Sequence, residues 1–107
     1  MRIIARRTLR EFADSLAGHK DQPAVKSALD TWYHVVRKAE WSKAADVKAS
    51  FATASIITAE RIVFNIKGGN YRLVVAVDFE KKIVRIKWIG THRDYDSIDV
   101  AEVKYVG

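Results

Sequence analysis

The sequence predicts an α+β fold in which helices pack on one face of an antiparallel sheet. Apolar residues recur every three or four positions in the first half of the chain, the period of amphipathic helices. Between residues 61 and 89 they alternate with polar residues, the period of half-buried strands. Because the helical run precedes these strands as a block, the predicted order is β-α-α-(α)-β-β-β, an α+β sandwich.

Composition limits the kind of protein that this chain can be. A chain of 107 residues is expected to form a single domain, spanning residues 1–107, around one core. Hydrophobic residues make up 49% of it, which favours folding over disorder. No apolar stretch approaches the roughly 20 residues of a membrane span, and the basic N-terminus lacks the apolar core of a signal peptide. The absence of cysteine excludes disulfides and thiolate metal sites and fits a cytoplasmic protein. Without an apolar span, no membrane partner is expected.

The N-terminal part is expected to hold a short strand at residues 2–5 and a helix from Thr8 to Gly18. Thr8 and Glu11 have the spacing of a capping box, and Gly18 suits the position after a helix end. The apolar face of this helix consists of Leu9, Phe12, Ala13 and Leu16.

A second helix is expected to begin at Asp21, with Pro23 in its first turn, where the missing N–H of proline is not needed. Ser42 can cap a shorter third helix, and residues 52–59 are expected to form a loop or a weak, short strand. The apolar stripe of the second helix consists of Val25, Ala28, Leu29, Trp32, Val35, Val36 and Ala39.

Three strands joined by tight turns are expected between residues 61 and 89. The first ends at Gly68-Gly69, a two-residue turn signal, because glycine reaches positive φ without steric cost. Continued alternation puts every aromatic residue of these strands on the core side, and all three tryptophans of the chain are expected in the core. The residues assigned to the core side are Ile62, Phe64, Ile66, Tyr71, Leu73, Val75, Val77, Phe79, Val84, Ile86 and Trp88.

The opposite side of the same strands collects positive charge. The net charge of the chain is +6, and residues 61–93 hold eight Lys and Arg against two acids. The helices are expected to leave this face uncovered, so that it forms a basic cleft suited to a phosphate backbone. The alternative is a basic face that only keeps the strands soluble. The polar residues assigned to this face are Asn65, Lys67, Arg72, Arg85 and Lys87.

The densest cluster of reactive side chains follows the third strand, at residues 90–96. His92 can exchange a proton near neutral pH, and Tyr95 lies three positions further on, on the same side of a turn. Arg93 stands between them, where it can contact a phosphate. The aspartates of this segment lack the pattern of a metal site. A structural hydrogen bond of the His–Tyr pair is the alternative to catalysis.

Four short motifs, spread in order over nearly the whole chain, carry a family resemblance. They are Asp46-Val47-Lys48 with Phe51, Val63-Phe64-Asn65-Ile66, Gly69-Asn70-Tyr71-Arg72-Leu73-Val74, and Ile89-Gly90-Thr91-His92 with Tyr95-Asp96. In these motifs the chain resembles the HigB-type toxins of bacterial toxin–antitoxin pairs. Those toxins belong to the RelE/ParE-like superfamily of small α+β proteins.

The resemblance implies an activity and partners. It implies an mRNA endonuclease that uses no metal or other cofactor and acts on messages being translated at the ribosome. It also implies a cognate antitoxin with a DNA-binding helix-turn-helix, which inhibits the toxin and through which the pair reaches its operator DNA.

The same resemblance implies roles for single residues. Arg72 stands where RelE-like toxins place an arginine that contacts the scissile phosphate, and His92 and Tyr95 stand in the Thr-His-x-x-Tyr-Asp motif near the cleft. The chain departs from better-known RelE toxins by ending in acidic residues rather than a basic tail, so the general base is left open between His92 and Tyr95. The residues expected to hold flanking phosphates are Lys67, Arg85, Lys87 and Arg93.

Two other functions remain open. A ParE-like member of the superfamily would inhibit a topoisomerase through a protein surface and would need neither a positive cleft nor a His–Tyr cluster. A non-catalytic RNA-binding module would show exposed aromatic residues on the sheet face. Fold alone does not separate these functions.

Overall fold

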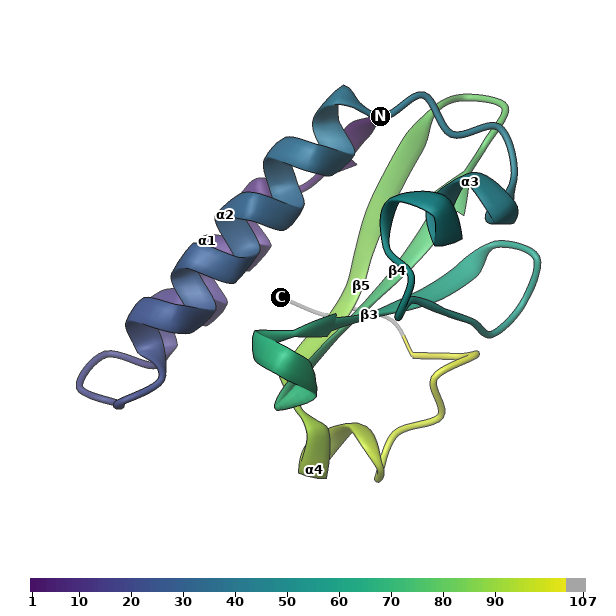
Figure 1. Cartoon of the computed structure of the whole chain (residues 1–107). Coiled ribbons are helices and arrows are strands. Elements are labelled where there is room, and N and C mark those ends of the chain that lie inside the picture. The colour runs from purple at the N-terminus through teal and green to yellow at the C-terminus, as the bar shows by residue number, and fades with distance from the viewer. Residues whose placement is uncertain (104–107) are drawn as a thin grey trace.

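The computed structural model describes residues 1–103 and confirms the α+β order (Figure 1). Its elements are β1 (Arg2–Ile4), α1 (Arg6–Ser15), α2 (Gln22–Lys38), α3 (Ala44–Ser50), β2 (Ser55–Ile56), β3 (Arg61–Ile66), the 3₁₀ turn η1 (Lys67–Gly69), β4 (Tyr71–Asp78), β5 (Ile83–Thr91) and α4 (His92–Tyr95).

The sheet has five strands in the order β1-β5-β4-β3-β2. The three long strands form the expected antiparallel meander, and β2 pairs with β3 in the same antiparallel sense. The N-terminal strand β1 lies parallel to β5 at the other edge, with Ile3 opposite Val84. The sheet is therefore mixed, because its first strand runs in the same direction as its only neighbour, the last strand of the meander.

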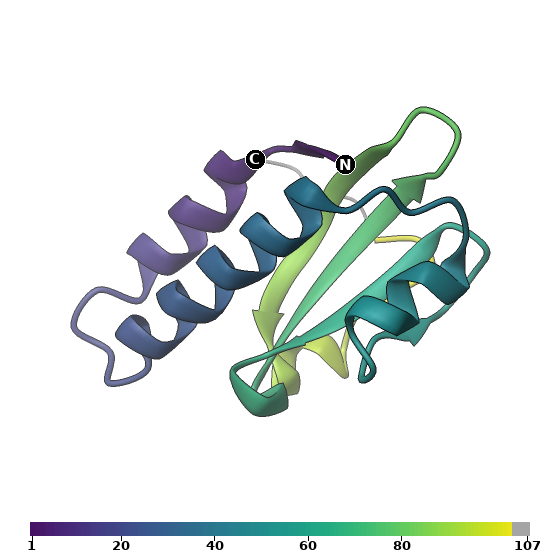
Figure 2. The same ribbon diagram turned by 45° about the horizontal axis from the view of Figure 1, so that its top comes forward.

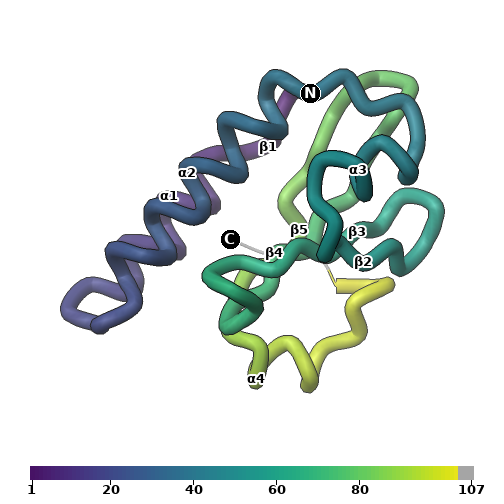
Figure 3. The backbone as a smooth tube through the Cα atoms, in the orientation of Figure 1, coloured from purple at the N-terminus to yellow at the C-terminus, as the bar shows by residue number. Residues whose placement is uncertain are grey.

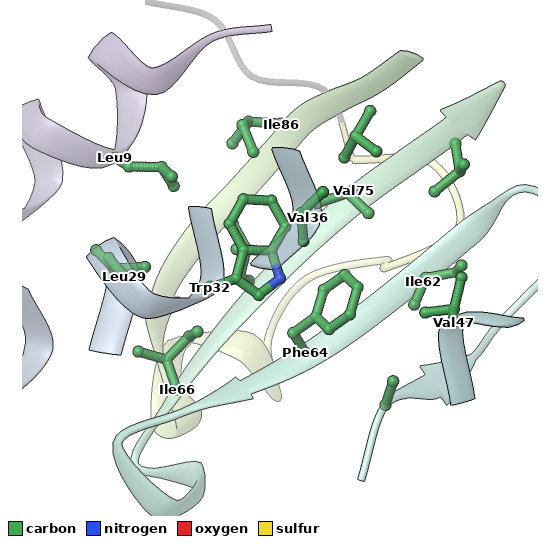
Figure 4. Packing of buried hydrophobic residues seen from close by; sticks show 14 of the residues in the cluster. Leu9, Leu29, Trp32, Val36, Val47, Ile62, Phe64, Ile66, Val75 and Ile86 are labelled. Atoms are coloured by element: carbon green, nitrogen blue, oxygen red, sulfur yellow. The ribbon is translucent and has the colours of Figure 1, made fainter. Parts of the chain in front are cut away.

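The helices α1 and α2 form an antiparallel pair along one face of the sheet, and α3 packs near β3 (Figures 1 and 2). The core lies between these helices and the sheet, and its centre is Phe64, which is 1% exposed (Figure 4). The ring of Trp32 stands edge-on to Phe64 at 5.4 Å, and that of Trp41 stacks on it at 6.4 Å. The two tryptophans of the helical half thus occupy the core as expected.

Most helix boundaries agree with the predicted ones to within two or three residues, but the caps predicted for the first and third helices do not. The capping box of Thr8 and Glu11 is absent, because α1 begins at Arg6 with Ala5 as its N-cap, and Glu11 instead accepts a hydrogen bond from Arg7 at 2.8 Å. The third helix begins at Ala44, two residues after the predicted cap Ser42.

The second helix begins where predicted, with Asp21 at the N-cap position and Pro23 in the first turn. The carboxylate of Asp21 makes no capping hydrogen bond, because it contacts side chains of the sheet instead. Val35 was expected in the apolar stripe, but it is 40% exposed and belongs to the outer side of the helix. The weak strand expected within residues 52–59 is present as β2.

The turn between β3 and β4 is longer than predicted. Ile66 pairs with Tyr71, so four residues separate the paired strands rather than two. Three of them have positive φ, namely 51° at Lys67, 63° at Gly68 and 96° at Gly69. The Gly-Gly pair does mark the turn, but a single turn of 3₁₀ helix replaces the predicted two-residue hairpin loop.

A bulge in β5 changes which residues of the third predicted strand face the core. Val75 lies opposite Ile86 and Val74 lies opposite Trp88, so Lys87 has no counterpart on β4. An extra residue of this kind shifts every later side chain to the other face. Ile89 therefore packs against the core. The prediction that Trp88 faces the core is wrong.

The face of the sheet away from α1 and α2, called the outer face below, is crossed by three rows of residues from β3, β4 and β5. Across these strands the rows are Asn65–Arg72–Gly90, Val63–Val74–Trp88 and Arg61–Ala76–Arg85.

The outer face is not open along its whole length. Helix α4 and the segment after it lie on this side (Figure 3). The guanidinium of Arg61 donates hydrogen bonds to the carbonyl oxygens of Val100, at 3.3 Å, and Val103, at 2.6 Å. Val63 and Val74 are almost fully buried, at 3% and 0% exposed. The helices were expected to leave this face uncovered. At the end of the sheet where Arg61 lies, that expectation is wrong, because the segment after α4 covers it.

Candidate functional site

The side chain of Arg72 is positioned by the turn that precedes its strand. Arg72 projects from β4 on the outer face, because its neighbours Tyr71 and Leu73 face the core. One guanidinium nitrogen, Nη1, donates a hydrogen bond to the carbonyl oxygen of Gly69. The guanidinium carbon lies 5.9 Å from the ring centre of Tyr95, within range of a cation–π contact. Arg72 thus connects the β3–β4 turn with α4.

Helix α4 follows β5 directly and carries the His–Tyr motif. Thr91 is its N-cap, with Oγ1 accepting a hydrogen bond from the amide of Asp94 at 3.1 Å. The amide of His92 donates to the carbonyl of Asn70 at 2.9 Å, which ties α4 to the β3–β4 turn. The imidazole Nε2 lies 3.9 Å from a carboxylate oxygen of Asp96, and both side chains are exposed, so this contact is weak even with a protonated imidazole.

The structure brings Arg72 and Tyr95 together. His92 lies on the same helical turn as Tyr95, as their spacing predicted, and the turn is a short α-helix rather than an irregular loop. The three residues assigned to catalysis from sequence therefore lie at one end of the outer face, where β4, β5 and α4 meet.

Trp88 is a member of this group that the sequence prediction missed. Its indole ring lies over Gly90, and its ring centre is 6.2 Å from that of Tyr95 with the planes inclined by 51°. The side chain is half-buried. A signal was present in the sequence: Ile86 and Ile89 are both apolar at a spacing of three, which strict alternation does not allow on one face. A bulge between them resolves the conflict.

The four residues expected to hold phosphates do not all share one face. Arg85 lies exposed on the outer face, opposite Ala76, and Arg93 is exposed on α4. Lys87 is the extra residue of the bulge and is half-buried. Lys67 departs from the prediction, since its ammonium lies 3.2 Å from the carboxylate of Asp21 on the helix side of the sheet. The longer turn removes it from the alternation that placed it beside Arg72.

Charge on the outer face is mixed. The arginines belong to the strands and to the start of α4, while the segment from α4 onward carries carboxylates. The guanidinium of Arg61 also lies on this side and donates hydrogen bonds to the carbonyl oxygens of Val100 and Val103. Besides Arg61, positive charge lies at Arg72, Arg85 and Arg93. The acidic residues of α4 and the segment after it are Asp94, Asp96, Asp99 and Glu102.

One hollow of the surface lies away from these residues. It has a volume of about 320 Å³ and lies between α1 and α2, with Arg10, Asp14 and Tyr33 in its wall. No candidate site residue lines it, so we treat it as a groove between two helices. Within residues 1–103, no group of three or more His, Asp or Glu side chains is placed to hold a metal ion. No helix in that range is long and apolar enough to cross a membrane.

Comparison with known proteins agrees with the fold and with the motifs. The HigB toxin family, described as the RelE-like toxic component of a toxin–antitoxin system, matches residues 25–98. The match includes most of α2, the whole meander and α4, and thus every residue of the site described above. No curated protein matches the chain. Because the family match covers more than half of the sequence, the chain belongs to the HigB family of RelE-like toxins, the toxic partners in toxin–antitoxin pairs.

Proposed function

We propose that this toxin is an endoribonuclease that cleaves messages while the cytoplasmic ribosome translates them, and so inhibits translation. The observation that carries the proposal is the contact between Arg72 and Tyr95 at the outer face, with His92 on the same helical turn. A cation for a phosphate and two groups able to exchange protons are thereby grouped at one end of the sheet. A helix-turn-helix antitoxin would hold the toxin inactive and alone would contact operator DNA.

The proposed reaction is attack of the RNA 2′-hydroxyl on the adjacent phosphate. The new bond joins the 2′-oxygen to phosphorus, the bond to the 5′-oxygen breaks, and one proton leaves the 2′-oxygen while another reaches the 5′-oxygen. Such a reaction needs a base, an acid and a cation for the charge that grows on the phosphoryl oxygens. We assign Arg72 to that charge and the two proton transfers to His92 and Tyr95. No step requires a metal or another cofactor.

Binding of the message would use the neighbouring side chains. Arg85, Lys87 and Arg93 would contact flanking phosphates, and arginine suits this role because its planar fork binds phosphate oxygens bidentately. Trp88 offers an aromatic ring beside Tyr95 for a nucleobase. Lys67, in its ion pair with Asp21, is left out of the RNA contacts.

Cleavage of a translated message in a cell-free system tests the proposal. Arg72→Ala, His92→Gln and Tyr95→Phe should each slow cleavage by roughly 10²–10⁴ while RNA and antitoxin binding persist. Arg37→Ala, which removes an exposed arginine in the last turn of α2, is the matched control and should cleave normally. Full activity in Arg72→Ala would remove the proposed site.

Two results would favour another function. The position of Trp88 on the outer face also suits a non-catalytic RNA-binding module, which would show RNA binding without cleavage by the unmodified protein. Growth arrest without message cleavage would instead indicate a ParE-like inhibitor of a topoisomerase.

A further inference from the structure

One carboxylate connects the helical hairpin with the end of the sheet where the site lies. Asp21 stands between α1 and α2. One of its oxygens lies 3.2 Å from the ammonium of Lys67, and the other accepts a hydrogen bond from the hydroxyl of Tyr71 at 3.1 Å. The side chains of Asp21 and Lys67 are only 17% and 29% exposed. Partial removal from water makes such a pair stronger than an exposed surface pair.

The turn that Lys67 begins contacts both candidate catalytic elements. Its Gly69 carbonyl accepts a hydrogen bond from the guanidinium of Arg72, and its Asn70 carbonyl accepts one from the amide of His92. Arg72 and the start of α4 are thus both held by the backbone of one short turn.

One residue of this turn, Lys67, has a backbone conformation that non-glycine residues rarely adopt. Lys67 has a φ of 51°, in the left-handed region, where a residue with a Cβ atom is sterically disfavoured. Backbone of this kind persists where surrounding contacts hold it in place. Besides the hydrogen bond from the Asn70 amide to its carbonyl, Lys67 is held by the ion pair of its side chain with Asp21, whereas Gly68 and Gly69 have no side chains to anchor.

We propose that Asp21 is a positioning residue for RNA cleavage, acting through Lys67 and the turn of residues 67–70 on Arg72 and His92. This inference rests on the proposed endoribonuclease function. Asp21 contacts neither the substrate nor the reacting atoms. It holds the turn in place, and the carbonyl oxygens of the turn hold Arg72 and His92, which make those contacts. Lys67 then serves as the second half of this clamp rather than as a phosphate contact.

The two roles of Lys67 make opposite predictions for Asp21. If Lys67 were a phosphate contact restrained by Asp21, Asp21→Asn would release it, strengthen RNA binding and steepen its salt dependence. If the pair is a clamp, Asp21→Asn leaves RNA binding nearly unchanged and slows the chemical step, because small misplacements of catalytic groups are costly.

A double-mutant cycle on cleavage measures the clamp. Asp21→Asn and Lys67→Met should each lower kcat about ten- to hundredfold with little change in KM. The double variant should be no slower than either single one, since both remove the same ion pair. Tyr71→Phe is the control: it removes the other partner of Asp21 and keeps the Lys67 pair, so stability falls while kcat is largely retained.

Additive losses in the cycle would overturn the inference, as would a rise in KM without a fall in kcat.

Amide hydrogen exchange supplies a readout that does not depend on cleavage. The amide of His92 is protected by the Asn70 carbonyl, so Asp21→Asn should speed its exchange while amides in the middle of β4 stay protected. If the unmodified protein cleaved no RNA, the proposed function would fail, and unchanged exchange at His92 would then separately overturn the clamp.

Discussion

The indole ring of Trp88 occupies the space that a side chain at position 90 would need. A Cβ atom on Gly90 would lie 2.6 Å from two ring carbons of Trp88, closer than carbon atoms pack. Gly90 is paired with Arg72 on the neighbouring strand, so the ring lies beside the candidate phosphate site. The glycine of the Gly-Thr-His motif is thus required by packing, not by backbone conformation.

Gly90→Ala should lower the free energy of unfolding by about 1–3 kcal/mol, the usual cost of forcing extra atoms into a packed site. The cost should shrink in a Trp88→Leu background, where no indole ring lies over position 90. Urea unfolding of the four proteins measures both effects. An equal cost in the two backgrounds would show that the ring does not cause it.

Trp88 should report RNA binding by fluorescence. Trp32 and Trp41 are buried, at 2% and 3% exposed, whereas Trp88 is half-buried on the outer face. A non-cleavable oligonucleotide, with deoxyribose at the scissile position, should therefore quench its emission. Trp88→Ala should abolish the quenching and weaken binding by about 1–3 kcal/mol, the value of one stacked base, while Trp88→Phe should retain part of the affinity. Full quenching in Trp88→Ala would exclude this ring from the interface.

The two glycines of the β3–β4 turn form a matched pair for testing how Arg72 is held. Both have positive φ, so alanine at either position should cost about 1–2 kcal/mol or more of stability. Only at position 69 would the new Cβ meet the Arg72 guanidinium, at 3.1 Å; at position 68 it would meet nothing within 4 Å. Gly69→Ala should therefore cleave RNA more slowly than Gly68→Ala at similar stability. Equal cleavage rates would contradict the proposed role of the turn.

The basic residues of the outer face should set the salt dependence of RNA binding. Removing one side chain that neutralises a phosphate of single-stranded RNA should flatten the slope of log affinity against log salt by about 0.7. Arg85→Gln and Lys87→Gln should each have this effect without unfolding the protein, and Lys26→Gln on the exposed side of α2 should not. An unchanged slope in the Arg85 and Lys87 double variant would remove both residues from the interface.

The clamp of Asp21 should make stability depend on pH at both extremes. Burial alone would raise the pKa of the Asp21 carboxyl, but hydrogen bonds from Lys67 and Tyr71 and the charge of Lys67 outweigh it and hold the pKa below its usual range. A carboxyl of this kind stabilises the fold above its unfolded pKa of about 3.9 and loses that contribution as pH falls through the lower folded value.

The pKa of Tyr71 shifts in the opposite direction from that of Asp21. Burial, followed by the hydrogen bond to Asp21 and its negative charge, raises the pKa of the Tyr71 hydroxyl. The stabilisation of the fold by the neutral Tyr71 hydroxyl is complete below its unfolded pKa of about 10. It is lost as pH rises through the higher folded pKa. The lowered pKa of Asp21 instead predicts that the stability difference between the unmodified protein and Asp21→Asn shrinks below about pH 4. A difference that grows on acidification would contradict the ion pair.

Much of the fold follows from patterns that are local in the chain. The helical spacing of α1 and α2 and the alternation in β3 and β4 depend only on residues a few positions apart, so the sequence alone placed Phe64 in the core and Arg72 on the outer face. The family motifs likewise marked the positions of Arg72, His92 and Tyr95 without any structural information.

Tertiary structure decided what depends on partners distant in the chain. The bulge at Lys87 is a property of the register between β4 and β5, and it moved Trp88 from the predicted core to the side of Tyr95. Asp21 and Tyr71 are 50 residues apart, and no spacing rule relates them. Local periodicity fixes which way a side chain points from its own strand or helix. Register shifts and ion pairs between elements depend on how those elements pack, and only the assembled fold sets that.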